Sequence, residues 1–243
     1  AIMAMALELA LHIPQSIGYL ISALIILPLV VKGVGFINKV QAITQPIWLI
    51  LLLLPWIFVW WKQPQLLEQS MQFVGITSHS TAFNLTYFGA ACTLLFVFVI
   101  QIGEQADYLR FLPPREQHPR SWLLAVFLGG PSWIIFGFVK ILMGMLLMVL
   151  AYRYAIPQTE LSNPTYLYWL AFQQGISSAD VALWLTVLLV CLAQIKINMT
   201  NAYAGSLAWS NFFARLTHSH PGRIVWLIFN ILIAIMLMEM GIS

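Results

Sequence analysis

The residues best suited to chemistry lie in segment 191–213, CLAQIKINMTNAYAGSLAWSNFF. This segment continues an apolar run, residues 181–190, that would by itself begin a membrane span. Polar and small residues then replace the apolar ones: Lys196, Asn198, Thr200, Asn201, Tyr203, Gly205 and Ser206. Polar side chains at membrane depth must face protein, water or a ligand, because contact with lipid is costly. Close helix packing explains the small residues but requires neither the lysine nor the asparagines, so we interpret the segment as a binding helix.

Composition predicts an all-α polytopic membrane protein. The chain is 61% hydrophobic and only 8% charged, a balance foreign to soluble domains of this length. We expect it to be a fragment of a longer protein, forming one transmembrane domain over residues 1–243. Its two cysteines, Cys92 and Cys191, lie in apolar runs and imply no disulfide framework.

Apolar runs long enough to cross a bilayer predict six membrane spans, at residues 16–36, 42–61, 81–102, 122–152, 179–213 and 224–240. Residues 1–11 are expected to be the end of a further helix, and 165–175 a short surface or re-entrant helix. Gly129, Gly130, Pro131 and Gly137 predict a kink in the fourth span.

The placement of basic residues predicts the topology. Seven of the 11 fall on one side of an alternating chain: Lys32, Lys39, Arg110, Arg115, Arg120, Arg215 and Arg223. The opposite loops hold only Lys62 and Arg153. By the positive-inside rule, the side with seven is cytoplasmic. We expect an integral, multi-pass protein of a bacterial inner (plasma) membrane.

A second polar group follows the third predicted span. Gln101 and Glu104 come directly after an unbroken apolar stretch, and an ionisable side chain at that depth is by default a functional candidate. Asp107 and Arg110 are three residues apart, so on a helix they would share a face and could pair. For Arg110 alone, an ordinary charged helix end in water is the simpler alternative.

The order of these motifs resembles the nucleobase–cation symporter family of purine, cytosine, allantoin and hydantoin permeases. The resemblance rests on DYLRF at 107–111, a following helix that contains glycine and proline, and TNAYAG at 200–205. It implies a LeuT-type inverted-repeat fold, of which this chain would supply about helix three to helix nine. The family's orientation also places the basic loops in the cytoplasm.

The resemblance further implies a substrate site. Phe98, beside Val97, falls on the family's substrate-stacking aromatic position, although an aromatic facing lipid or the core is an equal alternative. With Gln101 and Asn201 these residues form the expected substrate-binding set. Gly205 completes it, at a position where the family has a substrate-binding amide. Asp107 and Arg110 are the expected cytoplasmic gate.

The family's sodium ligands on this helix fall on Lys196, Met199 and Thr200, of which only Thr200 could offer an oxygen to sodium. The ammonium of Lys196 would supply the same positive charge without an ion. A buried lysine that can lose its proton is also a candidate coupling group, and we expect Glu104 to belong to the same cation or coupling site. Alternatively, Lys196 pairs with Glu104 or extends to the membrane interface. Lys196 and Gly205 are nine residues apart, so a regular helix puts them on opposite faces.

The expected function is secondary transport of a small planar nucleobase-like or related nitrogenous compound by alternating access, without sodium coupling. The alternative is a permease-like sensor module of a membrane histidine kinase, with the fused cytoplasmic kinase outside this chain. The segment RLTHSHPGR at 215–223 is typical of that subgroup. The expected partners are a small-molecule substrate and the lipid bilayer. No catalytic constellation is apparent, so we expect no enzyme, cofactor, metal or nucleic-acid partner.

Overall fold

The structure is a computed structural model that describes residues 1–73, 82–117, 119–130, 132–218 and 221–241. Nothing is described of the side chains of residues 97, 98, 100–104, 106–108 and 133. Over these ranges the chain is helical and forms no strand. It divides into two compact units, one of Ala1–Leu66 with Leu150–Ser243 and one of Leu67–Val149.

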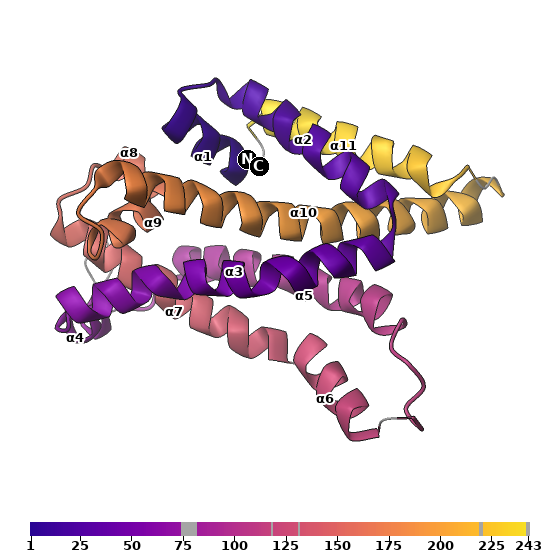
Figure 1. Cartoon of the computed structure of the whole chain (residues 1–243), viewed down its shortest axis with the longest axis horizontal. Helices are drawn as coiled ribbons and strands as arrows, with labels where there is room; N and C mark the ends of the chain where they lie inside the picture. The colour runs from indigo at the N-terminus through magenta and orange to yellow at the C-terminus, as the bar shows by residue number, and fades with distance from the viewer. Residues whose placement is uncertain (74–81, 118, 131, 219–220, 242–243) are drawn as a thin grey trace. The chain divides into compact units, whose positions relative to one another are not determined.

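The first unit is built around one long helix. Its elements are α1 (Ile2–Leu11), α2 (Gln15–Val31), α3 (Val34–Lys62), the end of α7 (Ser132–Arg153), α8 (Gln158–Leu161), α9 (Pro164–Gln173), α10 (Ala179–Thr217) and α11 (Arg223–Glu239). Helix α10 packs against α1, α2, α3, α9 and α11 (Figure 1). The segment that carries the polar residues is therefore the centre of the unit.

Local signals define the ends of α10. Ser178 caps its start by accepting a hydrogen bond from the Val181 N–H, and Asp180 lies in the first turn, where a negative charge is favoured. Arg215 lies in the last turn, and His218 ends the helix in a left-handed conformation. Its 39 residues make a helix roughly 58 Å long at 1.5 Å per residue.

The connections between the first three helices are short. Helices α1 and α2 meet at an angle of 120°, with His12 left-handed and Pro14 before α2, close to the predicted turn. Helices α2 and α3 are joined only by residues 32–33, because Gly33 adopts φ +86°, a conformation that side chains disfavour. The predicted loop at 37–41 is therefore wrong. No glycine or proline interrupts residues 36–45, so the helix continues and Lys39 lies on α3.

The second unit contains most of α4 (Leu66–Met71), α5 (Leu85–Leu109), α6 (Pro119–Gly129) and most of α7 (Ser132–Arg153). Helix α6 ends at Gly129 and α7 begins at Ser132, and Pro131 of the predicted kink lies outside the described residues. Gly129 lets Leu109 of α5 pack closely, since an added Cβ would lie 3.1 Å from that side chain.

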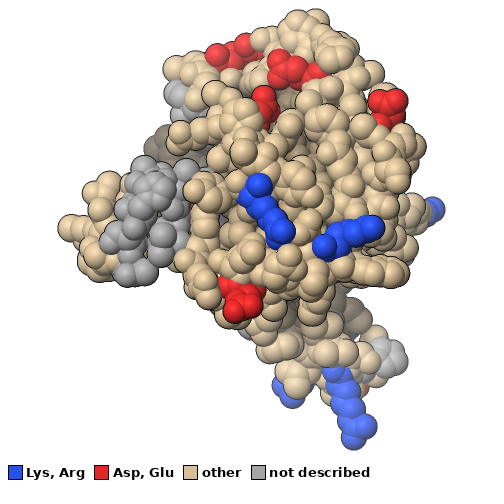
Figure 2. Space-filling view, turned by 90° about the vertical axis from the view of Figure 1, so that its left-hand side faces the viewer, with Lys and Arg blue, Asp and Glu red and all other residues tan. Residues whose placement is uncertain are grey.

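Three helical segments are long and apolar enough to cross a membrane: Val34–Lys62, Pro119–Arg153 and Ala179–Thr217. The bent pair α1 and α2 makes a fourth candidate if it counts as one span. Six spans were expected. Helix α11 has 17 residues and is shorter than these three. Helix α5 has 25 residues, Leu85–Leu109, of which Leu85–Phe96 is an apolar segment and most later side chains lie outside the described residues. The chain is a membrane protein with three or four candidate spans, and Figure 2 shows charged side chains standing apart on a mostly uncharged surface.

The two ends of the first unit differ in the charge of their side chains. Arg223 Nη2 donates to the Val31 carbonyl at 3.3 Å, which brings the start of α11 to the end of α2. Ser16 Oγ donates to Glu239 at 2.9 Å, which joins the other ends of the same helices. The first end carries Lys32, Lys39, Arg215 and Arg223, and the second carries Glu8, Glu160, Asp180 and Glu239 with Lys62 and Arg153. The basic residues predicted to share a side thus do so within this unit.

Candidate functional site

Lys196 is buried between α10 and α3, with 8% of its surface exposed. Its ammonium donates to the Gln41 carbonyl at 3.1 Å and to Thr44 Oγ1 at 3.3 Å. The same nitrogen lies 5.9 Å from the centre of the Trp48 ring, within cation–π range. A carbonyl, a hydroxyl and an aromatic face match the three N–H groups of an ammonium.

Helix α3 presents these three partners on one face, because residues 41, 44 and 48 are spaced by three and four. Thr44 Oγ1 donates to the Val40 carbonyl at 2.7 Å, which leaves its lone pairs for Lys196. The contact is reciprocal, since Gln41 Nε2 donates to the Lys196 carbonyl at 3.0 Å. Pro46 lies within α3 and lacks an N–H, so the Ala42 carbonyl, next to Gln41, has no donor four residues later in the helix.

Among the described side chains, no carboxylate forms an ion pair with Lys196. The side chain of Glu104, its predicted acidic candidate, lies outside the described residues. The ammonium therefore lies among uncharged oxygens, the ligand type that hard cations prefer. Met199, one turn further along α10, is fully buried. Thr200 Oγ1 donates to the Ile197 carbonyl at 2.7 Å, so its hydroxyl proton is used within its own helix.

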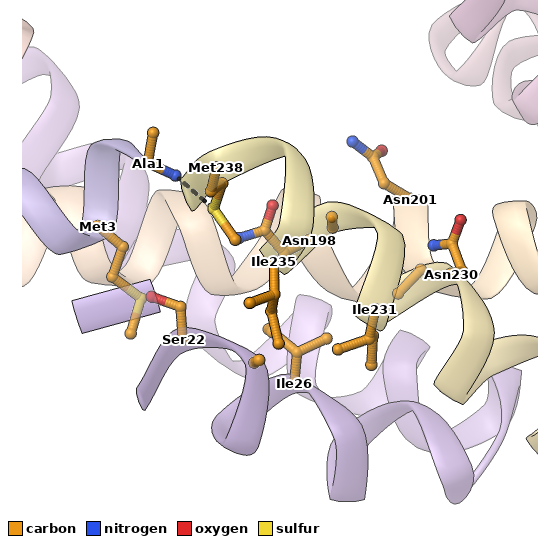
Figure 3. A pocket seen from close by; sticks show the side chains of 13 residues that line it. Ala1, Met3, Ser22, Ile26, Asn198, Asn201, Asn230, Ile231, Ile235 and Met238 are labelled. Carbon is orange, nitrogen blue, oxygen red and sulfur yellow. Dashed lines mark hydrogen bonds between the residues drawn. The ribbon is translucent and has the colours of Figure 1, made fainter. Parts of the chain in front are cut away.

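The other face of α10 borders a cavity of about 250 Å³ between α1, α2, α10 and α11. Figure 3 shows its lining residues. Its polar side chains are Ser22, Asn198, Asn201 and Asn230, and its larger apolar ones are Met3, Ile26, Ile231, Ile235 and Met238. Lys196 thus lies on a different face of α10 from Asn198 and Asn201.

Gly205 lies against an amide from another helix. A Cβ at Gly205 would come within 2.9–3.1 Å of the Asn230 side-chain amide. Asn230 Oδ1 also accepts a hydrogen bond of 3.2 Å from Trp209 Nε1, which holds the amide in place. The Asn230 amide of α11 therefore lies where a side chain at position 205 would begin.

Asn230 is not among the site residues predicted from the sequence. A signal was present, because Asn230 is the only amide or hydroxyl residue between Arg223 and Glu239 of α11. A lone amide in a membrane helix must find a partner inside the protein.

Most predicted site residues on α5 have side chains outside the described residues. Val97, Phe98, Gln101, Glu104 and Asp107 lie on the helix, but their side chains are outside the described residues. Helix α5 ends at Leu109, so Arg110 follows the helix, with its guanidinium 5.0 Å from the Phe111 ring centre. The predicted pair of Asp107 and Arg110 therefore remains a prediction.

The described residues contain no group of histidine, cysteine, aspartate and glutamate that could hold a metal ion. Comparison of the chain with protein-family models, curated proteins and solved structures finds no match. We therefore infer a function from the residues of this chain.

Proposed function

We propose that the chain is part of a secondary transporter for a small planar nucleobase-like or related nitrogenous compound, working without sodium. The proposal includes the LeuT-type inverted-repeat fold and the nucleobase–cation symporter family that the motifs at 107–111 and 200–205 resemble. It also includes a multi-pass placement in a bacterial inner membrane, with the basic end of the first unit in the cytoplasm.

The observation that carries the proposal is the buried ammonium of Lys196, held by oxygens of α3 without a carboxylate among the described residues. A buried charge costs free energy, and packing of two helices does not require one. A charge kept at that cost is by default functional in a membrane protein. We infer that it does what a bound cation does in a coupled transporter, holding α10 against its neighbour.

A tethered cation differs from a bound one in that it cannot dissociate. The contact of α10 with α3 would then be independent of sodium concentration. It could be broken only by movement of the helices or by loss of the proton from the ammonium. Transport that depends on proton concentration rather than on sodium is the corresponding mechanism.

The opposite face of α10 supplies groups that suit a ligand. Asn201 and Gly205 belong to the predicted substrate set, and both lie on the side of α10 that faces α11. Because one rigid helix carries both faces, its movement relative to α3 would be felt at the asparagines. This arrangement supports alternating access rather than catalysis.

Uptake by the full-length protein in proteoliposomes tests the proposal. We expect saturable uptake of at least one compound from a panel of radiolabelled uracil, cytosine, hypoxanthine and hydantoin. Lys196→Met should abolish it. The matched control Lys39→Met, which removes an exposed lysine of α3, should retain it. Absence of uptake for every compound would contradict a transporter of this class, and binding without uptake would favour the sensor module.

A further inference from the structure

We propose that the basic end of α10 binds the headgroup of an anionic phospholipid. Arg215 and Asn211 hold the phosphate, and Phe212 and Leu216 contact the hydrocarbon next to it. These four residues line one open hollow near the end of α10. The site is separate from Lys196 and goes beyond the proposed transport mechanism.

The first argument is that the charge of Arg215 is not balanced by the protein. Its side chain is exposed, and among the described residues it forms no ion pair. Arg223, at the same end of the unit, is already engaged with the Val31 carbonyl. The acidic residues of the first unit all belong to the opposite end: Glu8, Glu160, Asp180 and Glu239. A partner of Arg215 must therefore bring its own negative charge.

The second argument is that donors and apolar side chains share the hollow. Asn211 and Arg215 are four residues apart, so they lie on one face of α10. A guanidinium binds two phosphate oxygens at once, and the Asn211 amide, which has no partner among the described residues, can donate to the same group. Phe212 and Leu216 are 57% and 65% exposed. A free phosphate would leave both uncovered, whereas a phospholipid joins an anionic group to hydrocarbon.

The third argument concerns the position of the hollow in the membrane. Helix α10 is a candidate span of 39 residues, and at roughly 58 Å it is longer than the 40–45 Å or so of a bilayer with its headgroups. Its end therefore reaches the headgroup layer. Trp209 of α10 packs against Phe213 and against Phe229 of α11, and aromatic residues are typical of this layer. Because helical side chains point toward the N-terminus, Arg215 extends back toward these rings.

Quenching of a fluorophore beside the hollow by spin-labelled lipids tests the proposal. The reporter is bimane on Ala208→Cys in the full chain with Cys92→Ser and Cys191→Ser. Ala208 is exposed and shares a face of α10 with Phe212 and Arg215. The protein is placed in phosphatidylcholine nanodiscs that contain a small, varied fraction of a lipid with a nitroxide near the start of one acyl chain. This lipid is either phosphatidylglycerol, which is anionic, or phosphatidylcholine, which has no net charge.

We expect phosphatidylglycerol to reach half-maximal quenching at about one-fifth of the fraction that phosphatidylcholine needs, the scale for one basic side chain near an anionic surface. Arg215→Gln should remove most of this preference. The matched control Lys39→Gln, which removes an exposed lysine at the same end of the unit, should keep it. Bimane on Leu188→Cys, an exposed position on the other half of α10, should show no preference for phosphatidylglycerol.

Three results would overturn the proposal. The first is equal quenching by the two lipids at Ala208→Cys. The second is an equal loss of preference in Arg215→Gln and Lys39→Gln, because the whole basic end would then attract the lipid without a site. The third is loss of the preference when inorganic phosphate is added at constant ionic strength, which would assign the hollow to a free anion. The measurement involves no uptake, so its outcome is independent of the transporter proposal.

Discussion

The close contact of Gly205 with Asn230 makes Gly205→Ala a quantitative test of the structure. A Cβ there would lie 2.9 Å from Oδ1 and 3.0 Å from Nδ2 of Asn230, so the amide must turn away. Turning breaks the hydrogen bond from Trp209, at a cost of about 0.5–1.5 kcal/mol. Overpacking adds about 1–3 kcal/mol, and alanine recovers about 0.5–1 kcal/mol over glycine in a helix. We expect the free energy of unfolding to fall by about 2 kcal/mol.

Thermal unfolding of the detergent-solubilised protein measures this effect. A loss of this size lowers Tm by roughly 4–8 °C for a chain of this length. The control is Gly35→Ala in α3, where an added Cβ meets no atom within 4 Å, and its Tm should be unchanged or higher. In an Asn230→Ala background, Gly205→Ala should no longer destabilise. An equal loss in that background, or no loss in the single variant, would refute the packing of α10 on α11.

Three further predictions concern topology, the ligand and pH. If the basic end of the first unit is cytoplasmic, Thr217→Cys should resist a membrane-impermeant thiol reagent in intact cells, and Gln65→Cys should react quickly. The reverse pattern would contradict the topology. If Phe98 stacks on a planar ligand, Phe98→Ala should weaken binding by about 1–3 kcal/mol, by analogy with aromatic stacking on bases. Phe98→Trp should be tolerated. Unchanged affinity of Phe98→Ala would show that Phe98 does not contact the ligand. Burial raises the pKa of Tyr168, in the short helix α9, to about 12. Because this lies above the unfolded value of about 10, the free energy of unfolding should fall by up to about 2–3 kcal/mol from pH 10 to 12. Denaturant titration should show that Tyr168→Phe lacks this additional fall.

Local sequence signals predicted several elements because their causes are local. Pro14 marks the bend before α2, and Gly129 is the last residue of α6. The short helix predicted at 165–175 is α9, whose first helical residue is Pro164. The connection of α2 to α3 was misplaced because Gly33, not the polar residues at 38–41, ends the helix. Three or four of the six expected spans are candidates among the described residues, and the segments expected at 81–102 and 224–240 are present as α5, with 25 residues, and α11, with 17.

The candidate site was predictable only in part. The helical period alone places Lys196 and Gly205 on different faces of α10. The partners Gln41, Thr44 and Asn230 depend on which helices pack together, and in membranes this is decided by close packing and hydrogen bonds rather than by hydrophobicity. Gln41 and Thr44 each look like an ordinary polar residue near a helix end. Their role is visible only from the position of the ammonium.

The most direct test of the central claim is uptake of the compound identified in the panel, with sodium replaced by choline on both sides of the membrane. If Lys196 is the built-in cation, uptake by the unaltered protein should persist without sodium. Lys196→Met should be inactive in both media, and Lys196→Ala should regain partial activity only at high sodium, since it opens space beside Thr200. Loss of uptake on removing sodium, or full activity of Lys196→Met, would contradict the account.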